Sequence, residues 1–164
     1  VGVLVLANFG ARRQLVIGGV PVGRLLERDA APEPERGSII LVVATDAPLL
    51  DRGLRRLARR TAFGLARTGS IGGHGSGDIA IAFSSHPGVR VPHYADGNLA
   101  TVTLLSESGP QADGAPIDAL FQATIEAAEE AILNALFRAV TVVGRDGNRR
   151  EALPLNRVLD LLDS

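Results

Sequence analysis

Two features of the chain could carry out chemistry: the pair Gly37-Ser38, and a serine and an acid, Ser76 and Asp78, at the end of a glycine-rich loop. Ser38 directly precedes residues 39–44, a run of consecutive apolar residues that is typical of a buried strand. A serine hydroxyl is a weak nucleophile and needs a neighbouring proton acceptor. Taken alone, Ser38 is more simply a strand-start residue. With Gly37 in front of it and a second serine and an acid downstream, the pattern favours a nucleophile.

The proton acceptor of Ser38 could be its own α-amine, if the bond between Gly37 and Ser38 is cut. Gly37 suits such a cut, because a residue without a Cβ lets the peptide adopt a strained backbone and leaves its carbonyl open to attack. The Ser38 hydroxyl would attack this carbonyl, an N-to-O acyl shift would give an ester, and water would hydrolyse the ester. The pattern therefore suggests a chain that cuts itself and then uses the freed serine.

The remaining polar motifs fit other chemistries poorly. The loop Gly72 to Gly77 lacks the Gly-Lys-Ser/Thr ending of a P-loop, and it runs into a strand, where a dinucleotide fingerprint runs into a helix. It also lacks the spacing of a nucleophile elbow. His74, His86 and His93 do not have the spacing of a zinc site, and the chain has no cysteine. We therefore expect no metal and no other cofactor.

The composition indicates one globular domain without a nucleic-acid or membrane partner. The 164 residues are 46% hydrophobic with a net charge of -1. The arginines between Arg52 and Arg60 are expected to form the solvated face of a helix, and no apolar run approaches the ~20 residues that cross a bilayer. The chain begins at Val1 and contains no methionine, which indicates a piece of a longer precursor. Cytoplasmic and periplasmic localisation both stay open.

The apolar patterns predict strands that alternate with helices. Strands are expected at 1–9, 39–45 and 79–84, with another at 14–17 that forms a hairpin with the first, and a short one at 101–105. Helices are expected at 50–68, 117–136 and 154–162, and a turn at 144–147. Residues 24–37 carry prolines and charges without periodicity, which is typical of an exposed, flexible linker that tolerates a break. These elements predict a layered α/β (α+β) architecture.

Several stretches resemble the self-processing L-aminopeptidase/D-esterase family, which includes the β-aminopeptidases. The similarity covers nearly the whole chain, in order and at matching spacing, and includes the processing site. The stretches are Val1-Gly2-Val3 through Ala7-Asn8-Phe9-Gly10; Arg36-Gly37-Ser38-Ile39-Ile40 through Thr45-Asp46-Ala47-Pro48-Leu49-Leu50; Leu57-Ala58-Arg59-Arg60 with Leu65-Ala66-Arg67-Thr68-Gly69-Ser70; Ser76-Gly77-Asp78-Ile79 with Ala82-Phe83-Ser84; and Glu129-Glu130-Ala131-Ile132 with Asn134-Ala135-Leu136.

This resemblance implies a four-layer αββα sandwich of the N-terminal-nucleophile type, here incomplete because the N-terminal half of the precursor is absent. Residues 1–164 would be a fragment of a single domain. Residues 1–37 would be the end of the α-subunit, with the linker at 24–37, and residues 38–164 the β-subunit. The resemblance also implies a homo-oligomer, a tetramer of cleaved protomers that contain the missing N-terminal segment.

The same matching assigns roles to the candidate residues. Ser38 would be the nucleophile, Ser76 would hydrogen-bond to it and orient it, and Asp78 would be the acid behind Ser76. Family members carry Glu or Asp at this last position. Asn8 matches an asparagine that helps to bind the oxyanion, a role that needs an N–H donor where negative charge develops. The implied reaction is autocleavage between Gly37 and Ser38, then release of N-terminal residues from small peptides, amides or esters through an acyl-Ser38 intermediate.

Two other functions remain open. One is an acyltransferase related to the ornithine acetyltransferases, which share the fold and the autocleavage but are expected to use threonine in place of Ser38. The other is an unprocessed, inactive domain with only a structural role in an oligomer. The preference for D-, L- or β-amino acids is also open, because most of the pocket would lie in the missing half.

Overall fold

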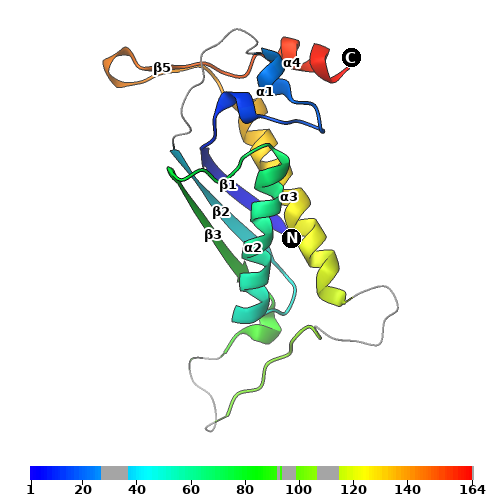
Figure 1. Cartoon of the computed structure of the whole chain (residues 1–164). Coiled ribbons are helices and arrows are strands. Elements are labelled where there is room, and N and C mark those ends of the chain that lie inside the picture. Colours follow the sequence, from blue (N-terminus) through cyan, green and yellow to red (C-terminus); the bar gives the residue numbers. More distant parts are fainter. Residues whose placement is uncertain (27–36, 92, 94–98, 107–114, 164) are drawn as a thin grey trace.

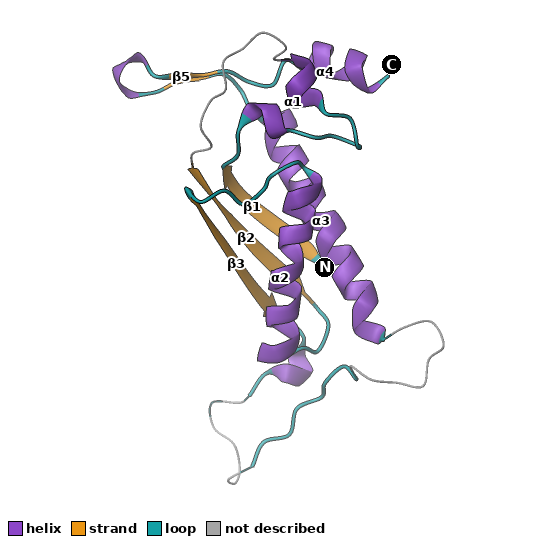
Figure 2. Cartoon of the chain, viewed as in Figure 1, coloured by secondary structure: helices purple, strands orange, loops and turns teal. Residues whose placement is uncertain are grey.

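A computed structural model of the chain describes residues 1–26, 37–91, 93, 99–106 and 115–163. Its centre is a three-stranded sheet of β1 (Gly2–Asn8), β2 (Gly37–Thr45) and β3 (Ser76–Ser84), in the order β1-β2-β3 (Figures 1 and 2). β1 runs antiparallel to β2, and β3 runs parallel to it. A parallel pair needs a crossover connection, and the helix α2 (Asp51–Arg67) supplies it.

The helices α2 and α3 (Pro116–Arg138) lie side by side on one face of the sheet (Figure 1). Their close contact depends on Gly64, where a Cβ would lie 2.6 Å from the carbonyl oxygen of Ile125 and 2.8 Å from Ala128 Cβ. On α2, the side chains of Arg56 and Arg60 lie over the ring of Phe121 on α3, at 4.8 and 3.9 Å from its centroid. These two members of the predicted arginine face therefore help to join the two helices.

Alternate residues of β2 form the core beneath the helices. Ile39, Leu41 and Val43 are buried, as the pleat of a strand requires when one of its faces is covered. Two apolar clusters hold the layers together. The first comprises Ile39, Leu41, Leu65, Ala128 and Ile132, and the second comprises Val43, Leu49, Leu57, Ile117 and Phe121.

The other face of the sheet is apolar and uncovered by the described residues. Leu4 and Leu6 are 71% and 68% exposed, and Ile79, Ile81 and Phe83 on β3 are about half exposed. The continuous apolar run of β2 predicts burial on both faces, but Ile40 and Val42 are only half-buried. The described part of the chain thus forms one layer of helices and one sheet layer.

Two short helices from opposite ends of the chain form a separate cluster at one end of the sheet (Figure 1). The helices α1 (Val22–Leu26) and α4 (Leu155–Leu162) share a core of Ile17, Val22 and Val158. A small hairpin, β4 (Val142–Val143) and β5 (Arg149–Arg150), precedes α4. Short 3-10 turns occupy Arg12–Gln14, Pro87–Val89 and Arg145–Gly147, the last within the predicted turn.

Three local predictions are wrong. Residues 14–17 form no strand with β1; Ile17 only bridges Val20, and β1 pairs with β2 instead. Residues 101–105 are not a strand, and the start of the predicted linker, Arg24 to Leu26, belongs to α1. Residues 27–36 of that linker lie outside the described residues. Within the described ranges, no helix is both long and apolar enough to cross a membrane.

Candidate active site

The sheet register brings Asn8 and Ser38 together. Asn8, the last residue of β1, pairs with Ser38 near the start of β2, and Gly77 of β3 pairs with Ser38 from the other side. Ile39 points into the core, so the alternation of a strand places Ser38 on the face that the helices do not cover. Asn8 lies directly opposite and shares this face. Both residues are exposed.

A backbone donor holds the Ser38 hydroxyl. The N–H of Gly77 donates a hydrogen bond to Ser38 Oγ at 3.1 Å. A Cβ at position 77 would lie 3.2 Å from the same oxygen, so glycine leaves the room that this contact needs. Sequence reasoning missed this role of Gly77. The available signal was its place between Ser76 and Asp78, the two residues already singled out.

Ser76 and Asp78 form a pair of their own. The Ser76 hydroxyl donates to Asp78 Oδ1 at 2.6 Å, as two residues on the same face of a strand can do. On β2, the residues that pair with Ser76 and Asp78 are Gly37 and Ile39. Ser76 and Asp78 therefore lie on the face of the sheet opposite to the Ser38 side chain. Among the described residues, no hydrogen bond joins Ser76 to Ser38 while Ser38 is linked to Gly37. The predicted orienting bond is therefore absent from the uncut chain.

Gly37 adopts a conformation that other residues avoid. Its φ is +115°, and a Cβ would lie 1.9 Å from the carbonyl oxygen of Asn8. Real Cβ atoms do not come that close to an oxygen, so only glycine fits without moving β1. The amide carbon of the Asn8 side chain lies 3.4 Å from the same point. Both the backbone and the side chain of Asn8 therefore lie close to Gly37, the residue before Ser38.

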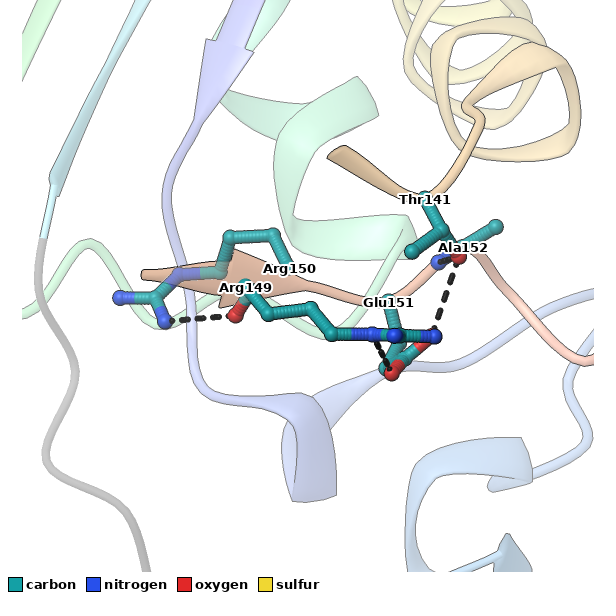
Figure 3. A network of polar contacts seen from close by, with 5 residues as sticks. All are labelled: Thr141, Arg149, Arg150, Glu151 and Ala152. Atoms are coloured by element: carbon teal, nitrogen blue, oxygen red, sulfur yellow. Dashed lines mark hydrogen bonds and ion pairs between the residues drawn. The ribbon is translucent and has the colours of Figure 1, made fainter. Parts of the chain in front are cut away.

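A second polar network belongs to the β4–β5 hairpin (Figure 3). Glu151 accepts hydrogen bonds from Arg149 Nε at 2.5 Å and from the Thr141 hydroxyl at 3.0 Å. The bond from Arg149, and then that from Thr141, keeps the pKa of Glu151 below its usual value; the same pairing raises the pKa of Arg149. These exposed groups brace the hairpin and include none of the predicted site residues.

Among the described residues, neither a candidate metal site nor the hollow along α3 includes Ser38. The described residues contain no group of three or more His, Asp or Glu side chains that could hold a metal ion. A hollow of about 410 Å³ lies along α3, lined by Glu126, Glu129, Glu130 and apolar neighbours. It includes none of the residues proposed to do chemistry.

Comparison with known proteins shows which proteins this chain resembles in sequence and in structure. Residues 1–150 match peptidase family S58. The β-peptidyl aminopeptidase BapA of Sphingosinicella microcystinivorans is 39% identical over 94% of the chain. Two solved structures superpose on 98% of the chain: a protein of Pyrococcus horikoshii OT3, with 46% identity and a TM-score of 0.81, and the L-aminopeptidase D-Ala-esterase/amidase of Ochrobactrum anthropi, with 35% identity and a TM-score of 0.82.

The Ochrobactrum enzyme is described as a prototype for the serine aminopeptidases and as a new variant of the Ntn (N-terminal nucleophile) hydrolase fold. The sheet and helices of the chain therefore belong to this α+β class of fold, as expected from the sequence. The chain is a member of peptidase family S58. It spans about two fifths of the length of these relatives, with coverage of 40% of BapA and 42% of each solved structure.

Proposed function

We propose that the chain is the catalytic part of a self-processing serine aminopeptidase/esterase, which cuts itself between Gly37 and Ser38. The observation that carries the proposal is the geometry of this bond. Gly37 is held at φ +115° against Asn8, and the hydroxyl of the following serine is fixed by the Gly77 N–H at 3.1 Å. Membership of a peptidase family supports a hydrolase, and nothing in the comparisons supports an acyltransferase or an inert domain.

In autocleavage, Ser38 Oγ attacks the carbonyl carbon of Gly37 and the bond from that carbon to the Ser38 nitrogen breaks. The leaving nitrogen takes up the proton that the hydroxyl loses and becomes the α-amine of Ser38, and water then hydrolyses the ester to a Gly37 carboxylate and a free Ser38 hydroxyl. Asn8 lies beside the attacked residue, which supports its role as a donor to the oxyanion. This step leaves Ser38 with a free α-amine as its base.

Departure of Gly37 also changes the surroundings of Ser76. Gly37 is the partner of Ser76 across the sheet, so the new amine of Ser38 would lie near the Ser76–Asp78 pair. We infer that this pair then orients the amine and the nucleophile. Turnover repeats the chemistry: Ser38 Oγ takes the acyl group of a small peptide, amide or ester, the amine product leaves with a proton, and water releases the acid.

The uncovered apolar face supports a further part of the proposal. A four-layer αββα sandwich needs a second sheet against Leu4, Leu6 and Ile81, and we assign that sheet to the N-terminal segment of the precursor. We also propose that cleaved protomers assemble into a homo-oligomer, a tetramer by resemblance to the family.

The decisive experiment compares the protein at its native length with its Ser38→Ala variant. The wild-type protein is expected to appear as two pieces that separate after Gly37, and to hydrolyse aminoacyl p-nitroanilides. Loss of the hydroxyl should leave one intact chain and no turnover, as read by intact mass and by nitroaniline release. Cleavage or turnover that persists in the variant would place the nucleophile elsewhere.

A further inference from the structure

The C-terminal end of α2 is held by two other parts of the chain. On one side, Arg67 forms an ion pair with Glu129 of α3, with Nη1 and Oε2 3.0 Å apart. Both side chains are partly buried, so solvent screens this pair less than a fully exposed one. On the other side, the N–H of Val16 donates a hydrogen bond to the carbonyl oxygen of the buried Thr68 at 3.0 Å. We call residues 67–69 the α2 anchor.

A short loop connects the α2 anchor with the serine–acid pair. Gly69 opens this loop with a φ of +95°, and a Cβ there would lie 1.7 Å from the carbonyl oxygen of Gln14, so the two main chains pack directly against each other. The loop then passes beside the acid, because a Cβ on Gly72 would lie 3.5 Å from Asp78 Oδ2. It ends at Ser76, whose hydroxyl donates to the same carboxylate. A displacement of the anchor would therefore reach both members of the pair.

The proposed cut makes the loop more important for the position of Ser76. In the uncut chain, Ser76 pairs with Gly37, and each of them is the first residue of its strand. When Gly37 departs as a carboxylate, this pairing ends, and the loop with its anchor is what remains on that side of Ser76. Gly77 retains its partner Ser38 within the sheet. The backbone donor to the nucleophile therefore depends on strand pairing more than on the loop.

We propose that the α2 anchor positions the Ser76–Asp78 pair for the turnover of substrates and has little influence on autocleavage. Among the described residues of the uncut chain, Ser76 makes no hydrogen bond to the Ser38 hydroxyl that attacks the chain. Arg67 and Glu129 are then positioning residues that act through the loop. The segment after β1 lies before the cut and the loop lies after it, so one piece would help to position the pair in the other. This inference rests on the proposed function and separates the requirements of its two steps.

A charge swap tests the proposal in protein of native length. Arg67→Glu places a second carboxylate beside Glu129, and the repulsion should displace the anchor and lower kcat for an aminoacyl p-nitroanilide at least about tenfold. Arg67→Glu combined with Glu129→Arg restores an ion pair and should recover most of kcat. Arg55→Glu is the matched control, because Arg55 pairs with Asp51 of the same helix, at 2.8 Å. Its kcat should stay within about twofold of wild type.

The same variants are followed through autocleavage, as the rate at which the intact chain separates after Gly37. This rate should stay within about twofold of wild type in all of them. The pH profile of kcat should change in Arg67→Glu and return in the double variant, because the pair orients the amine of Ser38. Circular dichroism checks folding, and Arg67→Gln, which removes the ion pair without repulsion, provides a milder variant in which kcat should fall while autocleavage does not.

Three results would overturn the inference and leave the proposed function intact: an unchanged kcat in Arg67→Glu, a loss that the charge swap does not repair, or equal losses of autocleavage and turnover. Wild-type protein that neither cuts itself nor hydrolyses the p-nitroanilide would overturn the proposed function as well.

Discussion

The three candidate partners of Ser38 stand in different relations to it. Gly77 donates through its backbone, Asn8 lies beside the preceding residue, and Ser76 is engaged with Asp78 at 2.6 Å. Because Ser76 and Asp78 face away from the Ser38 side chain in the uncut chain, their contribution should begin with the new amine. The carboxylate of Asp78 would then act through Ser76, as a positioning group.

We predict that Asp78→Asn lowers kcat by about 10²-fold, within the range typical of a lost proton-transfer partner. The amide can still accept the hydrogen bond of Ser76, but it no longer carries the negative charge that orients the Ser38 amine. Asp78→Glu, which retains the charge, should restore most of the activity. Steady-state kinetics with one p-nitroanilide over a range of pH measures both variants. An Asn variant with wild-type kcat and an unchanged pH profile would remove Asp78 from the mechanism.

Several of these residue details could not be predicted from the sequence. Ser38 as nucleophile, the Ser76–Asp78 pair and Asn8 were proposed from residue type and family resemblance. The positive φ of Gly37 and its contact with Asn8 depend on the pairing of strands that lie 30 residues apart, so no local pattern reveals them. The donor to Ser38 is a backbone N–H, which every residue except proline carries, and a search for reactive side chains passes over it.

The helix layer depends on one close approach. At Gly64, α2 contacts the backbone of α3 with no room for a Cβ, although glycine is a poor residue for the middle of a helix. Gly64→Ala would favour the helix by about 1 kcal/mol on propensity alone. The crowding against Ile125 and Ala128 should outweigh this gain, because overpacking typically costs about 1–3 kcal/mol.

We therefore predict that Gly64→Ala lowers the free energy of unfolding, as measured by denaturant titration. Gly53→Ala in the first turn of α2 is the matched control. Its nearest neighbour is Leu49 Cδ2, at 3.0 Å, which is the end of a side chain and not the backbone of another helix. Leu49 is itself buried, so the control should lose some stability, but less than Gly64→Ala. Equal or higher stability of Gly64→Ala would show that the two helices separate easily.

The elements themselves were largely predictable. The helices α2 and α3 begin and end within two residues of their expected limits, because their apolar positions recur at helical spacing and Pro116 marks a helix start. The strand partner of β1 was not predictable. The strand pattern of residues 14–17 suggested a local hairpin with residues 1–9, but the chain forms a 3-10 turn at Arg12–Gln14 and β1 pairs with β2. Pairing between distant strands leaves no local signature.

At the scale of the whole molecule, the described residues cover one face of the sheet and leave the other apolar. Exposed apolar patches of this kind mark surfaces that another element covers. We predict that Ile81→Asp, at a position 54% exposed here, strongly destabilises the protein at its native length, because a second sheet would bury the charge.

Phe63→Asp on α2 is the control, since Phe63 is similarly exposed, at 57%, but lies on the helix layer. Thermal unfolding of both variants should show a marked loss of stability for Ile81→Asp and a small change for Phe63→Asp. Similar small changes in the two variants would mean that the face of Ile81 meets solvent, and the four-layer arrangement would then be wrong.

The pairing of β1 with β2 has a consequence for the cut protein. All seven residues of β1 pair with β2, from Gly2 opposite Ala44 to Asn8 opposite Ser38. A break after Gly37 would therefore leave the two pieces joined along a whole strand, without a covalent bond. Folding of the uncut chain closes a loop within one molecule, whereas reassembly of the cut pieces is a meeting of two molecules that depends on their concentration. Before cleavage, refolding would be a step within one molecule. After cleavage, pieces that separate on unfolding and dilution would have to meet again before the fold could re-form.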